Sequence, residues 1–255
     1  MNESEKEVLM RFLSLDLTDS LPVLQPFAEL DGAVSCLKGY KRNFVYVPGA
    51  RKDRVVLIAH TDTVWDRYYD DGDGTPAPAS REHRPVMTPD GIVRQGGWQQ
   101  WGLGADDRAG CAILWLLRNS GHSLLLTDGE EIGGISADYL MCFRPDIADE
   151  LNAHRYMIQF DRRNSRDYKT YHLPVSDAFR RYIESKTGYR DAGTNSFTDV
   201  AALCTRICGV NLSVGYYNEH HENETLDYNA WLHTCQTVRR MLEDEQPEFL
   251  LEEDG

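Results

Sequence analysis

The chain has 255 residues, of which 41% are hydrophobic and 27% charged, and its formal net charge at pH 7 is −14. This length and composition are ordinary for one globular α/β domain, and no apolar run is long enough to span a bilayer. Nucleic acids and anionic membranes attract clustered lysine and arginine, so the acidic balance excludes both as expected partners.

The six cysteines are scattered, and the N-terminus is acidic rather than basic and apolar. Cys204 and Cys208 are four residues apart, but no second pair completes a zinc-finger pattern. We therefore expect free, buried thiols, no secretory signal and a cytoplasmic location.

Apolar residues in the N-terminal part follow first a helical and then an extended pattern. The predicted elements there are a helix at residues 3–15, a hairpin at 33–37 and 43–47, and a strand at 54–60. The last of these is a continuous apolar run, which is typical of a central strand buried on both faces.

Residues 65–101 form the least regular stretch, rich in Asp, Gly and Pro, with one short strand expected at 92–95. A loop of this length in a compact domain is usually functional or partly disordered, and we expect it near the active site. Its aromatic residues either line a specificity pocket or pin the loop to the core, and pinning is favoured. They are Trp65, Tyr68, Tyr69, Trp98 and Trp101.

Helices and strands alternate through the remainder of the chain. The predicted elements are a helix from 106 or 107 to 119, a strand at 122–126, a helix at 136–143, a strand at 155–160, helices at 176–186 and 200–206, a strand at 210–214 and a helix at 227–243. This alternation predicts a three-layer α/β/α fold, a mostly parallel sheet covered on both faces. We expect a single domain over residues 1–255, ending in a solvated acidic tail at 244–255.

Metal-binding residue types follow the carboxyl ends of several predicted strands, and one begins a helix. In chain order they are His60, Asp106, Glu130, Glu131, Asp161 and His220. Each alone has a structural explanation, since a histidine after a strand is seldom a ligand. Because parallel strands deliver their carboxyl ends to one rim, we expect the side chains to converge there.

Two imidazoles and three carboxylates suit a pair of divalent ions, with zinc expected first and cobalt or manganese as alternatives. Such a pair would activate a bridging water for attack on a carbonyl. A separate carboxylate must then move the proton, and the adjacent Glu130 and Glu131 allow one to bind metal while the other faces the water. Asp62 follows His60 by two residues and is placed to orient its imidazole.

The same residues resemble the co-catalytic zinc exopeptidase superfamily, which includes bacterial zinc aminopeptidases, glutamyl aminopeptidases, peptidase T and the glutamate carboxypeptidase group. The motifs that carry the resemblance are His60-Thr61-Asp62-Thr63-Val64, Gly104-Ala105-Asp106-Asp107-Arg108-Ala109-Gly110, Thr127-Asp128-Gly129-Glu130-Glu131-Ile132-Gly133, Phe160-Asp161 and His220-His221-Glu222-Asn223-Glu224-Thr225-Leu226-Asp227. The resemblance implies a phosphorylase/hydrolase-like zinc peptidase core.

The resemblance also implies a role for each metal-binding residue. Asp106 would bridge both metals. His60 and Asp161 would complete the coordination of one metal, and Glu131 and His220 that of the other.

The resemblance assigns catalysis to Glu130 as general base and to Asp62 as the partner of a ligand histidine. His220 is favoured over His221 because, in several relatives, an acidic residue follows the ligand histidine by four positions, as Glu224 does here.

Many relatives carry an inserted lid or dimerisation domain, and this chain has no room for one between the motifs. A lid function would then come from the 65–101 loop or from a neighbouring subunit, so a homo-oligomer is left open. The expected substrate is a short peptide or an amino-acid amide.

The sequence does not decide whether the amino end or the carboxyl end of the substrate is recognised. Asp199 resembles a residue near the substrate in these families, although Thr198 or Asp199 also suits a helix N-cap. An acidic residue would hold the α-ammonium of an aminopeptidase substrate, whereas Arg162 and Arg163 would hold the carboxylate of a carboxypeptidase or N-acyl-amino-acid amidohydrolase substrate. The missing lid favours the aminopeptidase. A non-catalytic peptide-binding relative is the remaining alternative, and the full ligand set argues against it.

Overall fold

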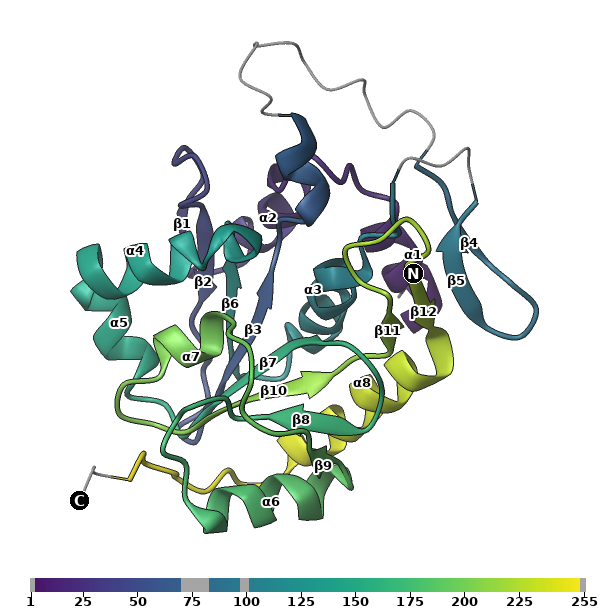
Figure 1. Ribbon diagram of the computed structural model, residues 1–255. Helices are drawn as coiled ribbons and strands as arrows, with labels where there is room; N and C mark the ends of the chain where they lie inside the picture. The colour runs from purple at the N-terminus through teal and green to yellow at the C-terminus, as the bar shows by residue number, and fades with distance from the viewer. Residues whose placement is uncertain (1–2, 70–82, 97–100, 253–255) are drawn as a thin grey trace.

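Short apolar strands build the centre of the molecule. The computed structural model describes residues 3–69, 83–96 and 101–252. Its main sheet has the order β1-β2-β6-β3-β7-β10-β8-β9 (Figure 1). These strands are β1 (Val34–Cys36), β2 (Phe44–Val47), β3 (Val56–His60), β6 (Ser123–Thr127), β7 (Met157–Arg162), β8 (Asp167–Lys169), β9 (Arg190–Asp191) and β10 (Gly209–Ser213).

The four central strands, β6, β3, β7 and β10, are parallel, and β2 and β8 pair with them antiparallel. The sheet is therefore mostly parallel, as predicted. All five residues of β3 are buried, which agrees with its position between β6 and β7.

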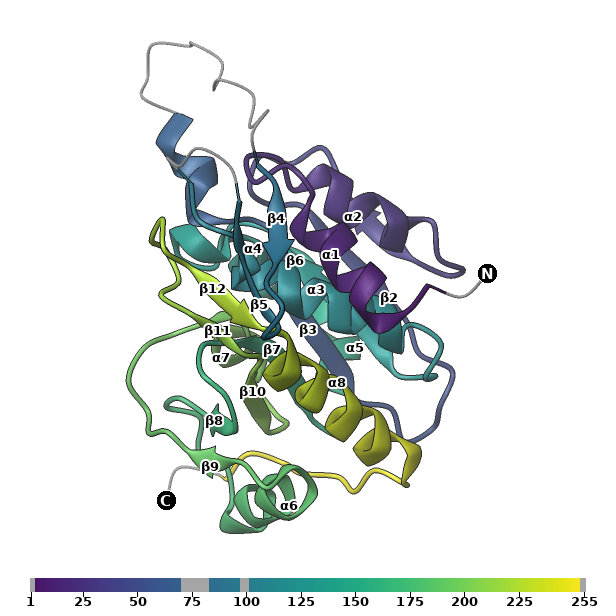
Figure 2. The ribbon, with the colours of Figure 1, turned by 90° about the vertical axis from the view of Figure 1, so that its right-hand side faces the viewer.

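Side chains of the central strands alternate between two hydrophobic cores. In β3, Leu57 and Ala59 belong to one core, while Val56 and Ile58 belong to the other. The first core includes residues of α1 (Glu5–Leu13), α2 (Leu21–Ala28), α3 (Ala105–Leu117), α6 (Asp177–Thr187) and α8 (Tyr228–Glu243). The second includes residues of α4 (Ile135–Phe143), α5 (Pro145–Leu151) and α7 (Asp199–Leu203). Helices thus cover both faces of the sheet, which confirms the three-layer α/β/α prediction; Figure 2 looks onto the face that carries α1, α3 and α8.

A second, four-stranded sheet has the order β11-β12-β5-β4. Its strands are β4 (Pro85–Met87), β5 (Ile92–Gln95), β11 (Tyr216–Tyr217) and β12 (Thr225–Asp227). The strand predicted at 92–95 is confirmed as β5. Part of the segment that we expected to be irregular is thus a hairpin paired with β12.

The aromatic residues of the 65–101 segment are only partly described. A 3₁₀ helix, η1, spans Val64–Tyr69. Trp65 is buried and meets Trp101 at a ring separation of 5.9 Å, beside Leu17. This packing supports pinning of the segment to the core. Trp98 and the side chains of Tyr68 and Tyr69 lie outside the described residues.

Every helix and strand predicted from the sequence has an observed counterpart, with ends shifted by a few residues. The elements that the sequence did not predict are α2, α5, β4, β8, β9, β11 and β12. Most of these are two or three residues long, too short to show a periodic pattern. The α2 helix holds Pro22 in its first turn and Pro26 inside, and the second proline predicts a break.

The C-terminal tail is only partly the solvated segment that we expected: its described acidic side chains are exposed, but other residues pack on the protein. Phe249 packs among Tyr156, Phe179 and Tyr182, with ring separations of 5.1 to 5.9 Å. Gln246 is buried and accepts a hydrogen bond from the Tyr156 hydroxyl. Phe249 and Gln246 thus hold the tail, up to residue 252, against the rest of the protein. The acidic composition of the tail gave no indication of this packing.

Residues 101–252 are described without a gap, and no inserted domain lies among them. Glu131 and Asp161 are separated only by helices α4 and α5 and most of β7. All six cysteines are free, and four of them are buried. Within the described ranges, no helix has the length and apolar character needed to cross a membrane.

Candidate metal and catalytic site

The carboxyl ends of the parallel strands bring together all six residues that the sequence singled out. His60 is the last residue of β3, and Asp161 lies near the end of β7. Glu130 and Glu131 begin a 3₁₀ helix, η2 (Glu130–Ile132), just after β6. Asp106 lies in the first turn of α3, and His220 in the loop between β11 and β12.

The carboxylate of Asp106 lies between two imidazoles. Its Oδ1 is 3.0 Å from His60 Nε2, and its Oδ2 is 3.0 Å from His220 Nε2. A second carboxylate approaches the same nitrogen of each imidazole: Asp161 Oδ1 is 3.4 Å from His60 Nε2, and Glu131 Oε2 is 3.2 Å from His220 Nε2. The site therefore has two halves that share Asp106.

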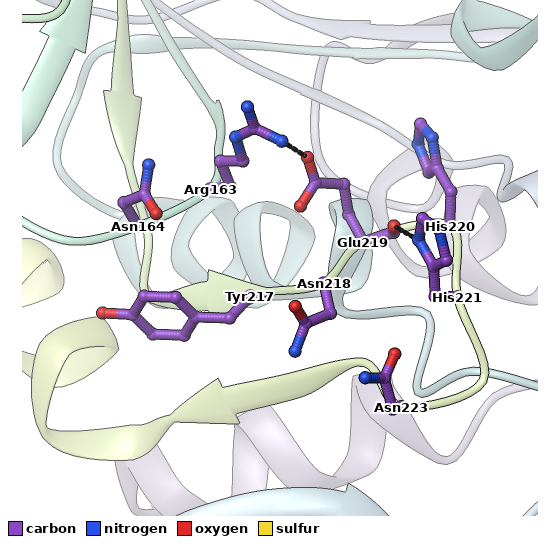
Figure 3. A pocket seen from close by; sticks show the side chains of 8 residues that line it. All are labelled: Arg163, Asn164, Tyr217, Asn218, Glu219, His220, His221 and Asn223. Carbon is purple, nitrogen blue, oxygen red and sulfur yellow. Dashed lines mark hydrogen bonds and ion pairs between the residues drawn. The ribbon is translucent and has the colours of Figure 1, made fainter.

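The structure distinguishes the two adjacent histidines. His220 faces Asp106 and Glu131, whereas His221 is exposed and its Nδ1 lies 2.7 Å from the carbonyl oxygen of Glu219 (Figure 3). The side chain of His220 is 46% exposed, so this half of the site is open to solvent.

The backbone around Asp106 has an unusual shape. Gly104 adopts a positive φ of 69°, and Asp106 and Asp107 depart from helical dihedral angles across a cis peptide bond. A side chain at Gly104 would meet Leu17 Cδ2 at 2.3 Å. Glu224 holds this turn in place, because its carboxylate accepts the N–H groups of Gly104 and Asp106 at 2.7 and 3.1 Å.

Glu130 and Glu131 occupy different positions, as they must if one binds metal and the other faces the attacking water. Glu131 is buried against His220, while Glu130 Oε2 lies 4.0 Å from His60 Nε2 and lines the open cleft. Asp62 supports both, because its carboxylate accepts their backbone N–H groups at 3.2 and 3.3 Å. Asp62 Oδ1 also lies 3.4 Å from His60 Nδ1, on the side of the ring away from Asp106.

The site holds several carboxylates within a water-poor space. Burial raises the pKa of Glu130 well above its ordinary value and that of Glu131 to about 7, and it also raises the pKa of Asp161. Burial opposes ionisation of Asp106 as well, but the hydrogen bonds from His220 and His60 prevail and lower its pKa. No lysine or arginine of the described residues forms an ion pair with any of these four carboxylates.

The donor set fits divalent cations. Ligand atoms of His60, Asp106 and Glu131 lie within 4.8 Å of one another, as do those of His60, Asp107 and Asp161. Glu131 Oε1 is buried without a hydrogen-bond partner, which is costly unless something else satisfies it. Imidazole nitrogen and carboxylate oxygen are the ligands of zinc and related metals, and cations would relieve the repulsion among the carboxylates.

A cleft of about 380 Å³ opens beside this cluster, and Asp106, Glu130, Asp161 and His220 are part of its lining. Two of the residues that we considered for substrate binding, Arg162 and Arg163, line it too. Arg162 forms a two-point ion pair with Asp167, and Arg163 pairs with Glu219 at 2.7 Å.

Asp199 does not line the cleft. It is fully buried, accepts a hydrogen bond from the Thr127 hydroxyl, and has a pKa raised to about 7 by burial. Thr198 holds the N-cap position of α7, but its hydroxyl makes no capping bond and instead donates to Asp161 Oδ2 at 2.6 Å. The N-cap function considered for this pair is therefore absent, and Thr198 orients Asp161.

Several supporting residues were not predicted from the sequence. Asp107 is fully buried and accepts the backbone N–H of His60 at 3.2 Å; its position directly after Asp106 was the available signal. Asn211 on β10 bonds both the N–H and the carbonyl of Asp161 at 2.8 Å, and Tyr216 donates its hydroxyl to Asp161 Oδ1 at 3.2 Å. Nothing in the sequence marks the last two, because only the fold brings them to Asp161.

No protein-family model and no curated protein sequence matches the chain. Solved structures do match it. Aminopeptidase PepT from Bacillus cereus ATCC 10987 is 13% identical, with a TM-score of 0.65 over 94% of this chain and 98% of that chain. A tripeptidase from Staphylococcus aureus subsp. aureus Mu50 is 12% identical, with a TM-score of 0.66 over 94% and 98%. The chain has the fold of these peptidases.

The Pyrococcus horikoshii TET1 peptidase also matches, with 16% identity and a TM-score of 0.57 over 94% of this chain and 99% of that chain. Identities this low establish the peptidase fold alone. The chemistry of this chain depends on its own residues.

Proposed function

We propose that the chain is a metal-dependent hydrolase that cleaves a peptide or amide bond, as an exopeptidase of the aminopeptidase type. The observation that carries the proposal is the shared carboxylate of Asp106, held between the imidazoles of His60 and His220 with a further carboxylate beside each. The aminopeptidase and tripeptidase among the solved structures of the same fold support it.

The proposed cofactors are two divalent ions, zinc first, with cobalt or manganese as alternatives. His60 and Asp161 would hold one ion, Glu131 and His220 the other, and Asp106 both. When bound, such ions supply Lewis acidity that activates a water and polarises the substrate carbonyl.

Glu130 is the proposed general base. It lines the cleft without contacting His220, so it can take the proton of the attacking water and deliver it to the leaving nitrogen. Burial raises its pKa, which helps it to keep that proton until the nitrogen accepts it. Asp62 fixes the position of this base through the backbone N–H groups of Glu130 and Glu131.

Reconstitution and a single substitution test the proposal. Protein freed of metal and reloaded with zinc, cobalt or manganese should hydrolyse an amino-acid p-nitroanilide. Glu130→Gln should lower kcat by about 10²–10⁴-fold and leave the bound metal, measured by elemental analysis, unchanged. The exposed Glu222, changed to Gln, is the matched control and should keep full activity.

Other outcomes would favour the alternatives. Faster hydrolysis of an N-acyl amino acid than of the p-nitroanilide would identify a carboxypeptidase or N-acyl-amino-acid amidohydrolase, which the basic residues in the cleft favour. Wild type and Glu130→Gln that behave alike on every peptide, with metal bound, would indicate a non-catalytic peptide-binding protein.

We also propose that the protein forms a homo-oligomer in the cytoplasm. The TET1 peptidase of the same fold assembles into a tetrahedron or a large octahedral shell. The chain has no inserted domain among residues 101–252 to cover its cleft, and a neighbouring copy would supply that cover. Sedimentation equilibrium measures the mass of the assembly, and a monomer at micromolar concentration would contradict this part.

A further inference from the structure

Three basic residues line the same cleft as the proposed catalytic carboxylates: Arg162, Arg163 and Lys169. The protein as a whole carries a net charge of −14, so a basic group at this place is unexpected. The groups that neutralise each of the three decide which of them can bind an anion.

Both arginines are already paired. Arg162 forms two parallel hydrogen bonds with Asp167, at 2.9 and 3.1 Å. Arg163 pairs with Glu219, and Figure 3 shows its guanidinium directed at that carboxylate. A substrate anion would have to compete with these partners, so the arginines make a poor anion site.

Lys169 has no such partner. It ends β8 and is only 9% exposed. Its ammonium donates to the carbonyl of Asn195 and, at 3.1 Å, to the hydroxyl of Ser196, both of which are neutral. Among the described residues, no carboxylate lies within 4.0 Å of this ammonium. A buried cation with no carboxylate in contact is costly, and an anion entering the cleft would lower that cost.

The sheet sets the separation between Lys169 and the catalytic residues. Lys169 is paired with Asn211 of β10, and Asn211 holds the backbone of Asp161 on β7. Lys169 and Asp161 are therefore two strands apart, roughly 10 Å at the usual strand spacing. An extended peptide covers such a distance in about three residues, and the lysine side chain shortens the gap.

We propose that Lys169 forms an anion subsite that binds a carboxylate of the short peptide substrate. The inference rests on the proposed peptidase function and adds a substrate class to it: peptides with a negative group within one or two residues of the scissile bond. That group is either the C-terminal carboxylate or the side chain of Asp or Glu. Both present the same chemistry to the ammonium.

Kinetics on matched substrates tests the subsite in the metal-loaded enzyme. The four substrates are Leu-Leu, Leu-Leu-amide, Leu-Glu-amide and Glu-Leu-amide. In the wild type, a preference for Leu-Leu over its amide identifies the C-terminal carboxylate, and a preference for a Glu amide over Leu-Leu-amide identifies the side chain. In Lys169→Gln, that preference should fall about 10–100-fold, mainly through KM, because a charged hydrogen bond is lost.

Three comparisons make the result specific. Lys169→Arg keeps the charge and should restore most of the preference. Lys186→Gln, which removes a surface lysine paired with Asp244, should leave the preference and the rates unchanged. Thermal melting shows whether Lys169→Gln is folded, and a folded variant that loses all four rates equally would overturn the subsite while the peptidase function stands.

Equilibrium binding keeps the two proposals separable. Leu-Leu and Leu-Leu-amide differ in one carboxylate, and calorimetry on metal-loaded Glu130→Gln, in which turnover should be slow, measures both affinities. Weaker binding of Leu-Leu but not of Leu-Leu-amide when Lys169→Gln is added supports the subsite even if the wild type hydrolyses no substrate, in which case the peptidase function alone fails. Equal affinities for the two peptides, together with no preference among the Leu and Glu substrates in the wild type, would overturn the subsite.

Discussion

The carboxylate of Glu224 joins two segments that are far apart in the sequence. It follows His220 by four residues and accepts N–H groups at both Gly104 and Asp106. The residue is 1% exposed, so water cannot replace these bonds. One side chain thereby fixes the distance between two of the proposed metal ligands, Asp106 and His220.

Glu224→Gln is expected to weaken metal binding about 10–100-fold, as does loss of other groups that orient ligands. The amide nitrogen of Gln cannot accept a hydrogen bond, so one of the two backbone N–H groups loses its partner. Competition with a chromophoric chelator measures zinc affinity, and thermal melting measures folding. The exposed Glu222, changed to Gln, should bind zinc like the wild type. Equal affinities in all three proteins would show that Glu224 has no positioning role.

Helix α3 packs so closely on β7 that one added methyl group at their contact should lower the stability of the protein. A Cβ at Gly110 would lie 2.4 Å from the carbonyl oxygen of Phe160 and 2.4 Å from Asp107 Oδ1. The carbonyl belongs to the buried sheet and cannot move aside cheaply. Glycine at this position is therefore explained by the approach of helix to strand.

Gly110→Ala is expected to destabilise the protein by about 2–3 kcal/mol through overpacking, although helix propensity alone predicts a gain of roughly 1 kcal/mol. Urea unfolding measures the difference. Gly188→Ala provides the contrast: nothing lies within 4 Å of that Cβ, and its cost of about 1 kcal/mol comes from the positive φ of 71° alone. Stabilisation by Gly110→Ala would show that the helix can shift.

The elements that could be predicted are those with a strong periodic pattern of apolar residues. The buried runs of β3 and β6, and the long amphipathic α8, follow their periodic patterns closely. Two-residue strands such as β9 have no period to detect, and the packed tail was hidden by its charge. The convergence of ligands at one rim was predicted because parallel strands require it. The residues that follow the carboxyl ends of these strands could therefore be identified as ligands from the sequence.

The surroundings of the ligands were not predictable in the same way. Lys169 reaches the cleft from β8, a three-residue strand that the sequence does not reveal, and its distance from Asp161 depends on the order of three strands. The residue pattern alone also left open which glutamate faces the cleft, and only the family resemblance assigned the base to Glu130. Only the turn at η2, supported by Asp62, separates Glu130 from Glu131.

Across the whole molecule, the two ends of the sheet place histidines in opposite environments. At the carboxyl ends, the hydrogen bonds with Asp106 and Glu131 raise the pKa of His220 to about 11. At the amino ends, burial lowers the pKa of His122 and lowers that of His154 to about 4. His154 Nε2 lies 3.1 Å from Arg54 Nε, which can only donate, so the ring must be neutral there.

His154 should therefore destabilise the folded protein in acid. Its pKa is about 4 in the folded protein and roughly 6.5 in the unfolded chain, so below pH 6.5 the unfolded chain binds the additional proton. The contribution of His154 is complete above pH 6.5 and is lost as the pH falls towards 4, on the order of 3 kcal/mol in total.

Urea unfolding of wild type and His154→Gln at pH 7.5, 6 and 5 isolates this contribution. The variant is expected to be less stable at pH 7.5, because it loses hydrogen bonds to Ser123 and Glu150, but to lose less stability on acidification. The exposed His172, changed to Gln, should follow the wild-type pH dependence. Parallel curves for wild type and His154→Gln would mean that the His154 imidazole has the same pKa in the folded and unfolded protein, and that His154 makes no contribution to the acid dependence of stability.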